Sequence, residues 1–314
     1  MCIRDRVGSI QTGHQLSLAG GGALSSGNAL LFNNAKFSPT DSGTFAILTT
    51  ANGPPYNVDF LVSSGTSVFG GAVGALDFGP PGAIPLPDGS VTKTGAGDFG
   101  IKHFRVHVMD INEGTLRINQ SSSVAGGTPD LVGSISGTSR TRRLRITGVT
   151  SPDAPTQSSI PVASLDLENN DLIVDWKGKF ISNPLGTLMN NGSLGVGSTG
   201  YVGAIRSAYI GNGTSELGQW LGKGITSTIA RNNNTIYAIG YADSNALFNM
   251  GTLGISTAMF SGQVVSDQAA LFKFTYLGDA NLDGRVNLDD FTILSSFFGT
   301  GTTWYRGDFN YNCL

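Results

Sequence analysis

The stretch that says most about the fold is Asp279-Ala-Asn281-Leu-Asp283-Gly284-Arg285-Val-Asn287-Leu-Asp289-Asp290. Oxygen-bearing side chains stand at positions 1, 3, 5, 9 and 12 of this segment, and glycine stands at position 6. Ca²⁺ binds about six to eight oxygens, and a short loop surrounds it only if alternate side chains point inward. The spacing therefore predicts a calcium-binding loop over residues 279–290.

Each position of the loop has a predicted role in binding Ca²⁺. The predicted ligands are the side chains of Asp279, Asn281 and Asp283, the backbone carbonyl of Arg285, Asn287 through a water molecule, and the bidentate carboxylate of Asp290. Gly284 permits the sharp turn between them. The alternative is a turn rich in Asp, Asn and Gly that binds no metal. The acidic twelfth position and the pattern that follows favour calcium.

That following pattern predicts an amphipathic helix. Apolar residues recur there at helical intervals, at Leu288, Phe291, Leu294 and Phe298. Gly299 is expected to end the helix, because glycine readily adopts the left-handed conformation found after helix C-termini. Two acidic residues at the start suit the positive end of the helix dipole. Phe291, Phe297 and Phe298 are then available to a partner.

A second, partial loop follows the helix. Gly307-Asp308-x-Asn310-x-Asn312 repeats the opening Gly278-Asp279-x-Asn281-x-Asp283. Asp308, Asn310 and Asn312 are its predicted ligands. Cys313 stands where the next glycine is expected, and Leu314 is the last residue.

These segments resemble the type I dockerin module, a pair of calcium loops each followed by a helix. The resemblance is carried by residues 276–291, by Trp304 and by residues 307–311, and it is closer to the dockerin-like C-terminal ends of large secreted proteins of planctomycete-type bacteria. It implies Ca²⁺ as cofactor and a cohesin-like or other cell-surface protein as partner. Cohesin-binding dockerins usually carry a Ser/Thr pair where this loop has Leu288 and Asp289, so the resemblance supports calcium more than it supports a cohesin.

The region before the loops is similar to the same class of secreted protein. The similar segments are 164–175, 205–209, 224–228 and 238–243, together with Trp220. We expect two strands around the turn at 168–171, a short helix near 202–210, and closing strands at 262–265 and 270–276. The Pro/Ser-rich stretch 151–164 is the expected boundary with the preceding region.

Residues 90–118 resemble the autotransporter-associated β-strand repeat, in which Lys-x-Gly-x-Gly precedes strands and then Gly-Thr-Leu. Here the matching residues are Lys93, Gly95, Gly97 and the Gly114-Thr-Leu run. The resemblance implies rungs of a right-handed parallel β-helix. His103 and His107 would suit a metal if this stretch were helical. The alternation of Lys102, Phe104, Val106 and Val108 instead predicts a strand with His103, Arg105 and His107 on its wetter face.

Composition indicates a mostly β protein. The 314 residues include 45 glycines, and charged residues make up only 13% of the chain. This is typical of many short strands joined by tight turns, and strand-like runs recur at 29–32, 44–48, 58–62 and 67–69. A net charge of −3 gives no reason to expect nucleic-acid binding, and no run has the length of a membrane span. The basic cluster at 140–145 is expected to be a solvated strand face.

The sequence gives no positive sign of catalysis. Asp166, Glu168, Asp171 and Asp175 suggest the paired carboxylates of a glycosidase, but they cluster at one turn and are interpreted as polar residues around a hairpin. Trp176, Trp220 and Tyr241 suit sugar stacking, although core positions are the commoner use of isolated aromatics. Nucleophile-elbow, phosphate-loop and zinc-protease motifs are absent.

Both ends of the chain match a translated sequencing adapter. Met1-Cys-Ile-Arg-Asp-Arg6 corresponds to a common transposon-type adapter, and Cys313-Leu314 corresponds to its reverse complement. We therefore expect a metagenomic fragment whose signal peptide has been lost and whose two cysteines are not native. The alternative is a genuine short N-terminus.

Together these features predict a secreted or cell-surface protein with four parts. They are an adapter-derived segment (1–6), a β-helix/solenoid-like region (7–160), a β-rich region with a short helix (161–275), and a small α-helical, truncated dockerin-like calcium module (276–314). The predicted role is structural or adhesive, with calcium-dependent attachment or assembly. The alternative is a fragment of a carbohydrate-active enzyme or carbohydrate-binding protein, with a polysaccharide as ligand.

Overall fold

A computed structural model describes most of the chain beyond residue 89. The described residues are 89–118, 131, 133, 137–149, 161–178, 183–187, 198–210 and 220–312, together with the backbone of four short strands nearer the N-terminus. The predictions for residues 1–6, 44–48, 151–160 and 313–314 lie outside these ranges.

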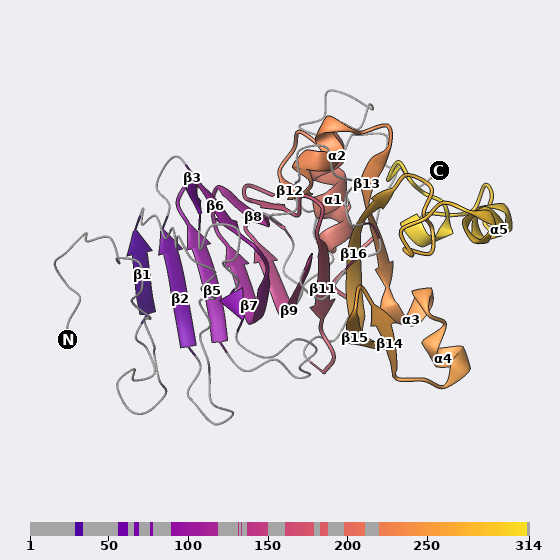
Figure 1. Cartoon of the computed structure of the whole chain (residues 1–314), viewed down its shortest axis with the longest axis horizontal. Helices are drawn as coiled ribbons and strands as arrows, with labels where there is room; N and C mark the ends of the chain where they lie inside the picture. Colours follow the sequence, from indigo (N-terminus) through magenta and orange to yellow (C-terminus); the bar gives the residue numbers. More distant parts are fainter. Residues whose placement is uncertain are drawn as a thin grey trace.

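Two sheets of mainly parallel strands form the body of the protein (Figure 1). The larger sheet has nine strands, in the order β1 (Ala29–Asn33), β2 (Tyr56–Leu61), β5 (Gly89–Thr94), β7 (Phe104–Ile111), β9 (Thr138–Ile146), β11 (Asp171–Asp175), β16 (Ala269–Tyr276) and β13 (Tyr237–Asp243), with β4 (Leu76–Asp77) beside β7. The smaller sheet has five parallel strands, in the order β12 (Gly224–Thr226), β10 (Ser164–Asp166), β8 (Thr115–Ile118), β6 (Asp98–Ile101) and β3 (Thr66–Val68).

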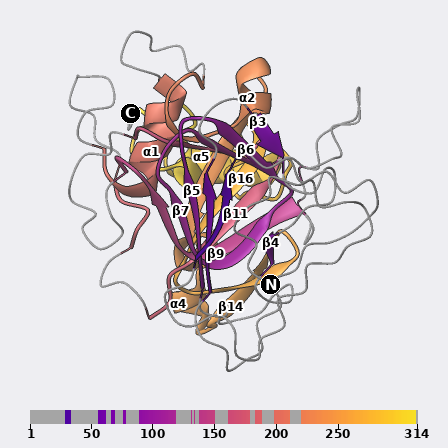
Figure 2. The same cartoon turned by 90° about the vertical axis from the view of Figure 1, so that its left-hand side faces the viewer.

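The chain alternates between the two sheets as it advances. From β5 onward, successive coils give one strand to the larger sheet and the next to the smaller: β5 then β6, β7 then β8, β9 then β10, β11 then β12. Parallel pairing in register places equivalent residues of each coil side by side. In Figure 2, turned so that the N-terminal strands face the viewer, the later strands lie behind the earlier ones.

Apolar residues fill the space between the two sheets. On the smaller sheet, one row of paired positions is buried throughout and consists of Phe99, Leu116, Leu165 and Ile225. On the larger sheet, a matching row consists of Val91, Met109 and Leu144. No single coil buries its own apolar face, so each coil depends on its neighbours for a core.

The far end of the larger sheet changes direction. β16 pairs antiparallel with β11, and β13 pairs antiparallel with β16. Around this end lie α1 (Gly200–Ile210), α2 (Thr228–Asn232), α3 (Ser244–Leu247), α4 (Met250–Leu253), the hairpin of β14 (Thr257–Phe260) and β15 (Gln263–Ser266), α5 (Leu288–Ser296) and the 3₁₀ helix η3 (Trp304–Arg306). The prediction of a mostly β protein is confirmed, and α1 lies where the short helix was expected.

The turn at 168–171 does not join a hairpin. Strands form on both sides of it as predicted, but β10 lies in the five-stranded sheet and β11 in the nine-stranded sheet. The turn therefore carries the chain from one sheet to the other. Positive φ, expected of Asn or Asp here, falls on Glu168, whose φ is 53°.

The basic cluster on β9 is not a uniformly solvated face. Arg140 is 1% exposed, forms an ion pair with Asp175 of β11, and donates to the carbonyl oxygen of Val264 at 2.7 Å. A second buried pair joins Lys273 Nζ of β16 to Asp171 Oδ2 of β11 at 3.2 Å. Both pairs lie where the parallel strands meet the antiparallel ones, a junction that the local sequence pattern does not reveal.

Two residues expected on the wetter face of this strand are buried instead. His103, directly before β7, is 5% exposed and Arg105 is 2% exposed, and the Arg105 guanidinium lies 2.8 Å from the His103 ring. The predicted strand is present, but its alternation shifts after Val106, since the next fully buried residue is Met109. The pairing of β7 with β9 skips one residue pair at this point.

Lys93 and the glycines of this region belong to one set of contacts. Its side chain lies in the inward row with Ile111 and Ile146, and its ammonium donates to the carbonyl oxygens of Gly95, Gly97 and Glu113. A Cβ on Gly114 would lie 2.3 Å from the Gly97 oxygen, so only glycine fits beside this ammonium. The Lys-x-Gly-x-Gly and Gly-Thr-Leu segments are therefore two halves of one turn structure.

Candidate calcium-binding loops

The loop after β16 is wound around its own side-chain oxygens. Asp279 Oδ1 accepts the amide of Asp283 at 3.1 Å, and Asp279 Oδ2 accepts the amide of Gly284 at 2.9 Å. Asn281 Oδ1 accepts the amide of Asp283 at 2.9 Å, and Asp283 Oδ1 accepts the amide of Arg285 at 2.9 Å. Side chains at positions 1, 3 and 5 thus point toward the loop backbone, as the spacing predicts.

Asp290 closes the loop from its twelfth position. Its Oδ1 accepts the amides of Ala280 at 2.8 Å and Asn281 at 3.2 Å, and its Oδ2 accepts the amide of Asn287 at 2.9 Å. Asp290 is 2% exposed and lies in the first turn of α5. One carboxylate therefore joins the start of the loop to its end.

The donor chemistry of the loop fits a hard divalent cation. Asp279, Asp283 and Asp290 offer carboxylate oxygens and Asn281 offers its amide oxygen, and such oxygens have lone pairs for a cation in addition to the amides they accept. Within the described ranges, no three His, Cys, Asp or Glu side chains converge to hold a metal by themselves. The predicted set depends on Asn281, Asn287 and a carbonyl as well as on carboxylates.

Burial makes the Asp279 carboxylate unfavourable without a positive partner. Desolvation is the largest cause that raises the pKa of Asp279 to about 6; the charges of Asp290 and Asp283 also raise it, and the hydrogen bonds from Thr275 and Gly284 oppose the shift. Its side chain is fully buried. A bound cation would relieve both the desolvation and the repulsion between carboxylates.

Two predicted ligands have structural roles of their own. Asn287 is the N-cap of α5, and its side chain accepts the amide of Asp289 at 2.7 Å, completing a capping box with Asp290. Arg285 is exposed, so only its backbone belongs to the loop. α5 ends at Ser296 with Phe297 as C-cap, and Gly299 follows with φ 73°. The apolar residues expected on one face of α5 stay largely exposed, with Phe291 at 62%.

The second loop repeats the first in conformation as well as in sequence. Asp308 Oδ1 accepts the amide of Asn312 at 3.0 Å, and Asn310 Oδ1 accepts the same amide at 3.3 Å. These are the bonds that Asp279 and Asn281 make four and two residues ahead. The backbone repeats too: φ is 105° at Gly278 and 98° at Gly307.

The fourth residue of each loop is a buried apolar side chain on a strained backbone. Leu282 has φ 60° and Tyr311 has φ 56°, both in the left-handed region that such residues seldom adopt. Leu282 is 4% exposed and Tyr311 is fully buried. The ligand spacing does not indicate the burial of either residue, although both stand between two predicted ligands.

Trp304 and Thr275 also contact the loop and were not predicted to do so. Trp304 Nε1 donates to the backbone oxygen of Asp279 at 2.7 Å, and Thr275 Oγ1 donates to Asp279 Oδ2. Thr275 belongs to β16, so the first ligand is held by the sheet as well as by its own loop. An aromatic residue stands a few positions before each Gly-Asp pair, and this is the sequence feature that could have indicated the contact of Trp304 with the loop.

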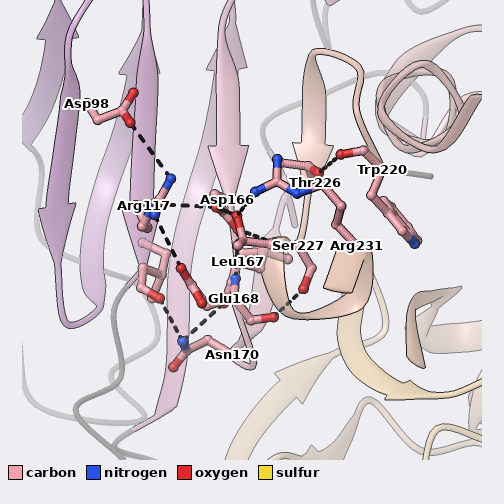
Figure 3. A network of polar contacts seen from close by, with 12 residues as sticks. Asp98, Arg117, Asp166, Leu167, Glu168, Asn170, Trp220, Thr226, Ser227 and Arg231 are labelled. Carbon is pink, nitrogen blue, oxygen red and sulfur yellow. Dashed lines mark hydrogen bonds and ion pairs between the residues drawn. The ribbon is translucent and has the colours of Figure 1, made fainter. Parts of the chain in front are cut away.

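The carboxylates considered for catalysis are paired with cations (Figure 3). Arg117 lies 3.4 Å from Asp166 and 3.7 Å from both Glu168 and Asp98. Asp166 Oδ1 also accepts the amide of Thr228 at 2.9 Å, which ties β10 to the start of α2. Burial, together with the charge of Asp166, raises the pKa of Glu168 to about 7, against the opposing charges of Arg117 and Arg231. Asp171 and Asp175 form the buried ion pairs described above, so all four carboxylates make contacts that stabilise the fold.

The aromatic residues considered for sugar stacking are buried. Trp176 is 8%, Trp220 1% and Tyr241 2% exposed, which places them in the core rather than on a binding surface. Among the described residues, no helix combines the length and the apolar character that crossing a membrane requires.

Comparison of the chain with protein-family models, with curated proteins and with solved structures gives no match.

Proposed function

We propose that the protein is an extracellular or cell-surface structural protein whose C-terminal loops bind Ca²⁺ and serve its attachment or assembly. The observation that carries the proposal is the repeated loop conformation. Two segments of different sequence place Asp and Asn at equivalent positions, make equivalent side-chain-to-amide bonds, and share positive φ at the same residues. The shared side-chain placement matches the ligand spacing at positions 1 and 3 of each loop, which supports a common ligand.

Calcium supplies charge neutralisation to this loop. Asp279, Asp283 and Asp290 would hold the cation with the side-chain oxygen of Asn281 and the backbone carbonyl of Arg285. Asn287, already the N-cap of α5, would contribute through water. The buried carboxylates of Asp279 and Asp290 anchor the two ends of the loop. Ligand binding and folding of the loop are thus expected to be linked.

The stacked coils support a β-helix-like scaffold for this role. Each coil gives one strand to each sheet, and the chain advances in one direction through five-stranded and nine-stranded sheets. Such a scaffold is elongated and presents a repeated surface, which suits a structural role. At its far end lies α5 (Figure 1), which exposes Leu288 at 73% and Phe291 at 62%, and the turn after it exposes Phe298 at 83%. This surface supports attachment to a protein partner.

Calcium titration tests the proposal. Calorimetry on the full chain, with Ca²⁺ raised to millimolar concentration, is expected to give saturable binding, and circular dichroism is expected to report added helix as α5 becomes ordered. Asp290→Asn keeps the size of the side chain, removes its charge and is expected to abolish binding. Asp289→Asn is the matched control, because Asp289 is adjacent, exposed and outside the predicted ligand set.

Two results would contradict the proposal. Absence of binding by the unaltered chain at millimolar Ca²⁺ would show that the loops are turns only. Equal weakening by Asp289→Asn and Asp290→Asn would show that any binding reflects general negative charge rather than this ligand set.

A further inference from the structure

We propose that calcium binding at residues 279–290 and docking of the two loops on β13, the last strand of the nine-stranded sheet, are one coupled event, with the two loops acting as the cap on β13. The inference rests on the proposed calcium binding and extends it. In this arrangement the loops pack on the preceding β region instead of forming a separate module. The bound cation stabilises that packing at the end of the sheet.

β13 is the last strand of the nine-stranded sheet and needs a cover. Its hydrogen-bonded partner in the sheet is β16, and no other described strand pairs with it. An uncovered edge presents unpaired amides and carbonyls to which other chains can add. Residues 237–243 of this strand are mostly buried, although they lie at the edge. Other parts of the chain must therefore bury them.

The loops supply that cover at the middle of the strand. A Cβ on Gly240 would project from the face of the sheet and lie 2.4 Å from Leu282 Cδ2 and 2.6 Å from Trp304 Nε1, so both side chains pack on the bare face of β13 at this glycine. Tyr311 Oη donates to the carbonyl oxygen of the neighbouring Ile239 at 2.7 Å. The equivalent fourth residues of the two loops, Leu282 and Tyr311, therefore reach adjacent residues of one strand.

The predicted calcium ligands are linked to the side chains on β13 by adjacent peptide bonds and by one hydrogen bond. Leu282 lies between Asn281 and Asp283, and its positive φ fixes how the two ligands are oriented around it. Trp304 Nε1 donates to the backbone oxygen of Asp279 while its ring lies on Gly240. A change in the position of Asp279 or Asp283 must therefore move a side chain that covers β13.

The second loop extends the cap to α1. Arg206 of α1 donates to the backbone oxygen of Tyr311. The Tyr311 ring packs against Trp304 at 5.5 Å, Trp220 at 5.8 Å and Tyr209 at 4.8 Å between ring centroids. All of these aromatic rings lie in or against the core that includes the β-strands. Release of the cap would thus open a packed interface rather than an isolated loop.

The coupling must act in both directions. If calcium favours the docked cap, then a change that disturbs docking must weaken calcium binding by the same factor. Without the cation, repulsion between the buried carboxylates favours an open loop, and β13 becomes exposed more often. Coupling between sites is typically about 5- to 150-fold in affinity.

Hydrogen exchange on the full chain tests the effect of calcium on the edge. Exchange of peptides covering residues 237–243 is expected to slow in Ca²⁺ compared with EDTA, along with exchange of the loop itself. Asp290→Asn is expected to leave exchange in these peptides fast in both conditions. Peptides covering β7 and β8, far from the cap, serve as the internal reference.

Calorimetry on two matched pairs of variants tests the reverse effect. Gly240→Ala places a methyl group against Leu282 and Trp304, and Trp304→Phe removes the bond to Asp279 but keeps an aromatic ring. Each is expected to weaken Ca²⁺ affinity about tenfold, within the usual range of coupling. The controls are Gly251→Ala, where the nearest atom to the new Cβ is 3.3 Å away, and Trp176→Phe, whose tryptophan is also buried. Both controls are expected to bind as the unaltered chain does.

The outcomes separate this inference from the proposed function. Calcium binding with unchanged exchange in 237–243 and unchanged affinity in both test variants would overturn the coupling but leave the calcium site standing. Failure of the unaltered chain to bind Ca²⁺ would overturn both. If Gly240→Ala does not fold, as judged by circular dichroism, Trp304→Phe and the exchange measurement decide the question.

Discussion

Lys93 introduces a positive charge into an inward-facing row of apolar residues. Three backbone carbonyls accept its ammonium hydrogens, which is why the charge is tolerated there. Lys93→Met keeps much of the side-chain volume but leaves those carbonyls without this donor. We expect a loss of about 2–3 kcal/mol in the free energy of unfolding, because hydrogen bonds to charged groups contribute on that scale. Urea denaturation at neutral pH measures it.

Lys102 provides the matched control for this change. Lys102 is only half-buried and lies in the bend between β6 and β7. Lys102→Met is expected to change stability by no more than about 0.5 kcal/mol, as is usual for substitutions outside specific contacts. Equal effects of the two substitutions would show that the carbonyl contacts of Lys93 contribute nothing specific.

Glu168 gives the fold a pH dependence with a defined sign. Burial raises its folded-state pKa to about 7 from the ordinary value of 4.5. Between these values the unfolded chain has released the proton that the folded chain keeps, so this residue makes the fold less stable as pH rises. Glu168→Gln holds the neutral form at every pH. We expect the variant to gain stability relative to the unaltered chain from about pH 4.5 to about pH 7.

Chemical denaturation of both proteins across this pH range measures the effect. The quantity compared is the difference in unfolding free energy at each pH, which removes contributions from all other titrating groups. A difference that stays constant from pH 4.5 to pH 7.5 would show that Glu168 has the same pKa in the folded and unfolded chain.

At the scale of elements, the buried ion pairs decide how the antiparallel end attaches to the parallel coils. Lys273 of β16 and Asp171 of β11 are both almost completely buried, and Ser261 Oγ bridges them. Asp171→Leu alone leaves the ammonium without its counter-charge and is expected to cost about 3–5 kcal/mol. Adding Lys273→Met removes the unpaired buried charge and is expected to restore a large part of the lost free energy of unfolding.

A double-mutant cycle in urea measures this interaction. The four proteins are the unaltered chain, each single variant and the double variant. If the double variant loses as much as the two single variants together, the residues do not interact, and the contact between β11 and β16 depends on the backbone ladder alone.

Sequence periodicity predicts which segments are strands but not which sheet receives them. Runs such as 164–166 and 171–175 have local signals of strand and turn, and both form strands. Whether they pair with each other depends on what the neighbouring coils offer, and here each joins a different sheet. The burial of Arg140 was missed for the same reason, because its partner Asp175 lies 35 residues away.

The candidate site is more predictable, because its chemistry is local. Twelve consecutive residues contain the ligand spacing, the turn glycine and the helix cap, so a single stretch of sequence identifies them. The contacts of Leu282 and Trp304 with Gly240 are different. They join segments about 40 and 60 residues apart, and no spacing rule within one segment could reveal them.

At the scale of the whole molecule, one continuous core links the coils to the C-terminal loops. Leu282, Trp304 and Tyr311 belong to the same cluster of buried residues as Phe272 of β16 and Leu144 of β9. Continuous packing favours cooperative unfolding, because no part can separate without exposing apolar surface of another. The expected boundary at residue 276 is therefore a boundary in sequence pattern, with buried side chains packed across it.

Calorimetric melting with and without Ca²⁺ tests this continuity. A ligand that binds only the folded state stabilises it by about 2.7 kcal/mol at a hundredfold excess over Kd. If the loops and the end of the sheet unfold together, calcium must raise the temperature of the main transition, and Asp290→Asn must abolish that rise. If the loops were an independent module, calcium would move a small separate transition and leave the main one in place. The size of the enthalpy that moves with calcium therefore measures how much of the molecule the cation holds together.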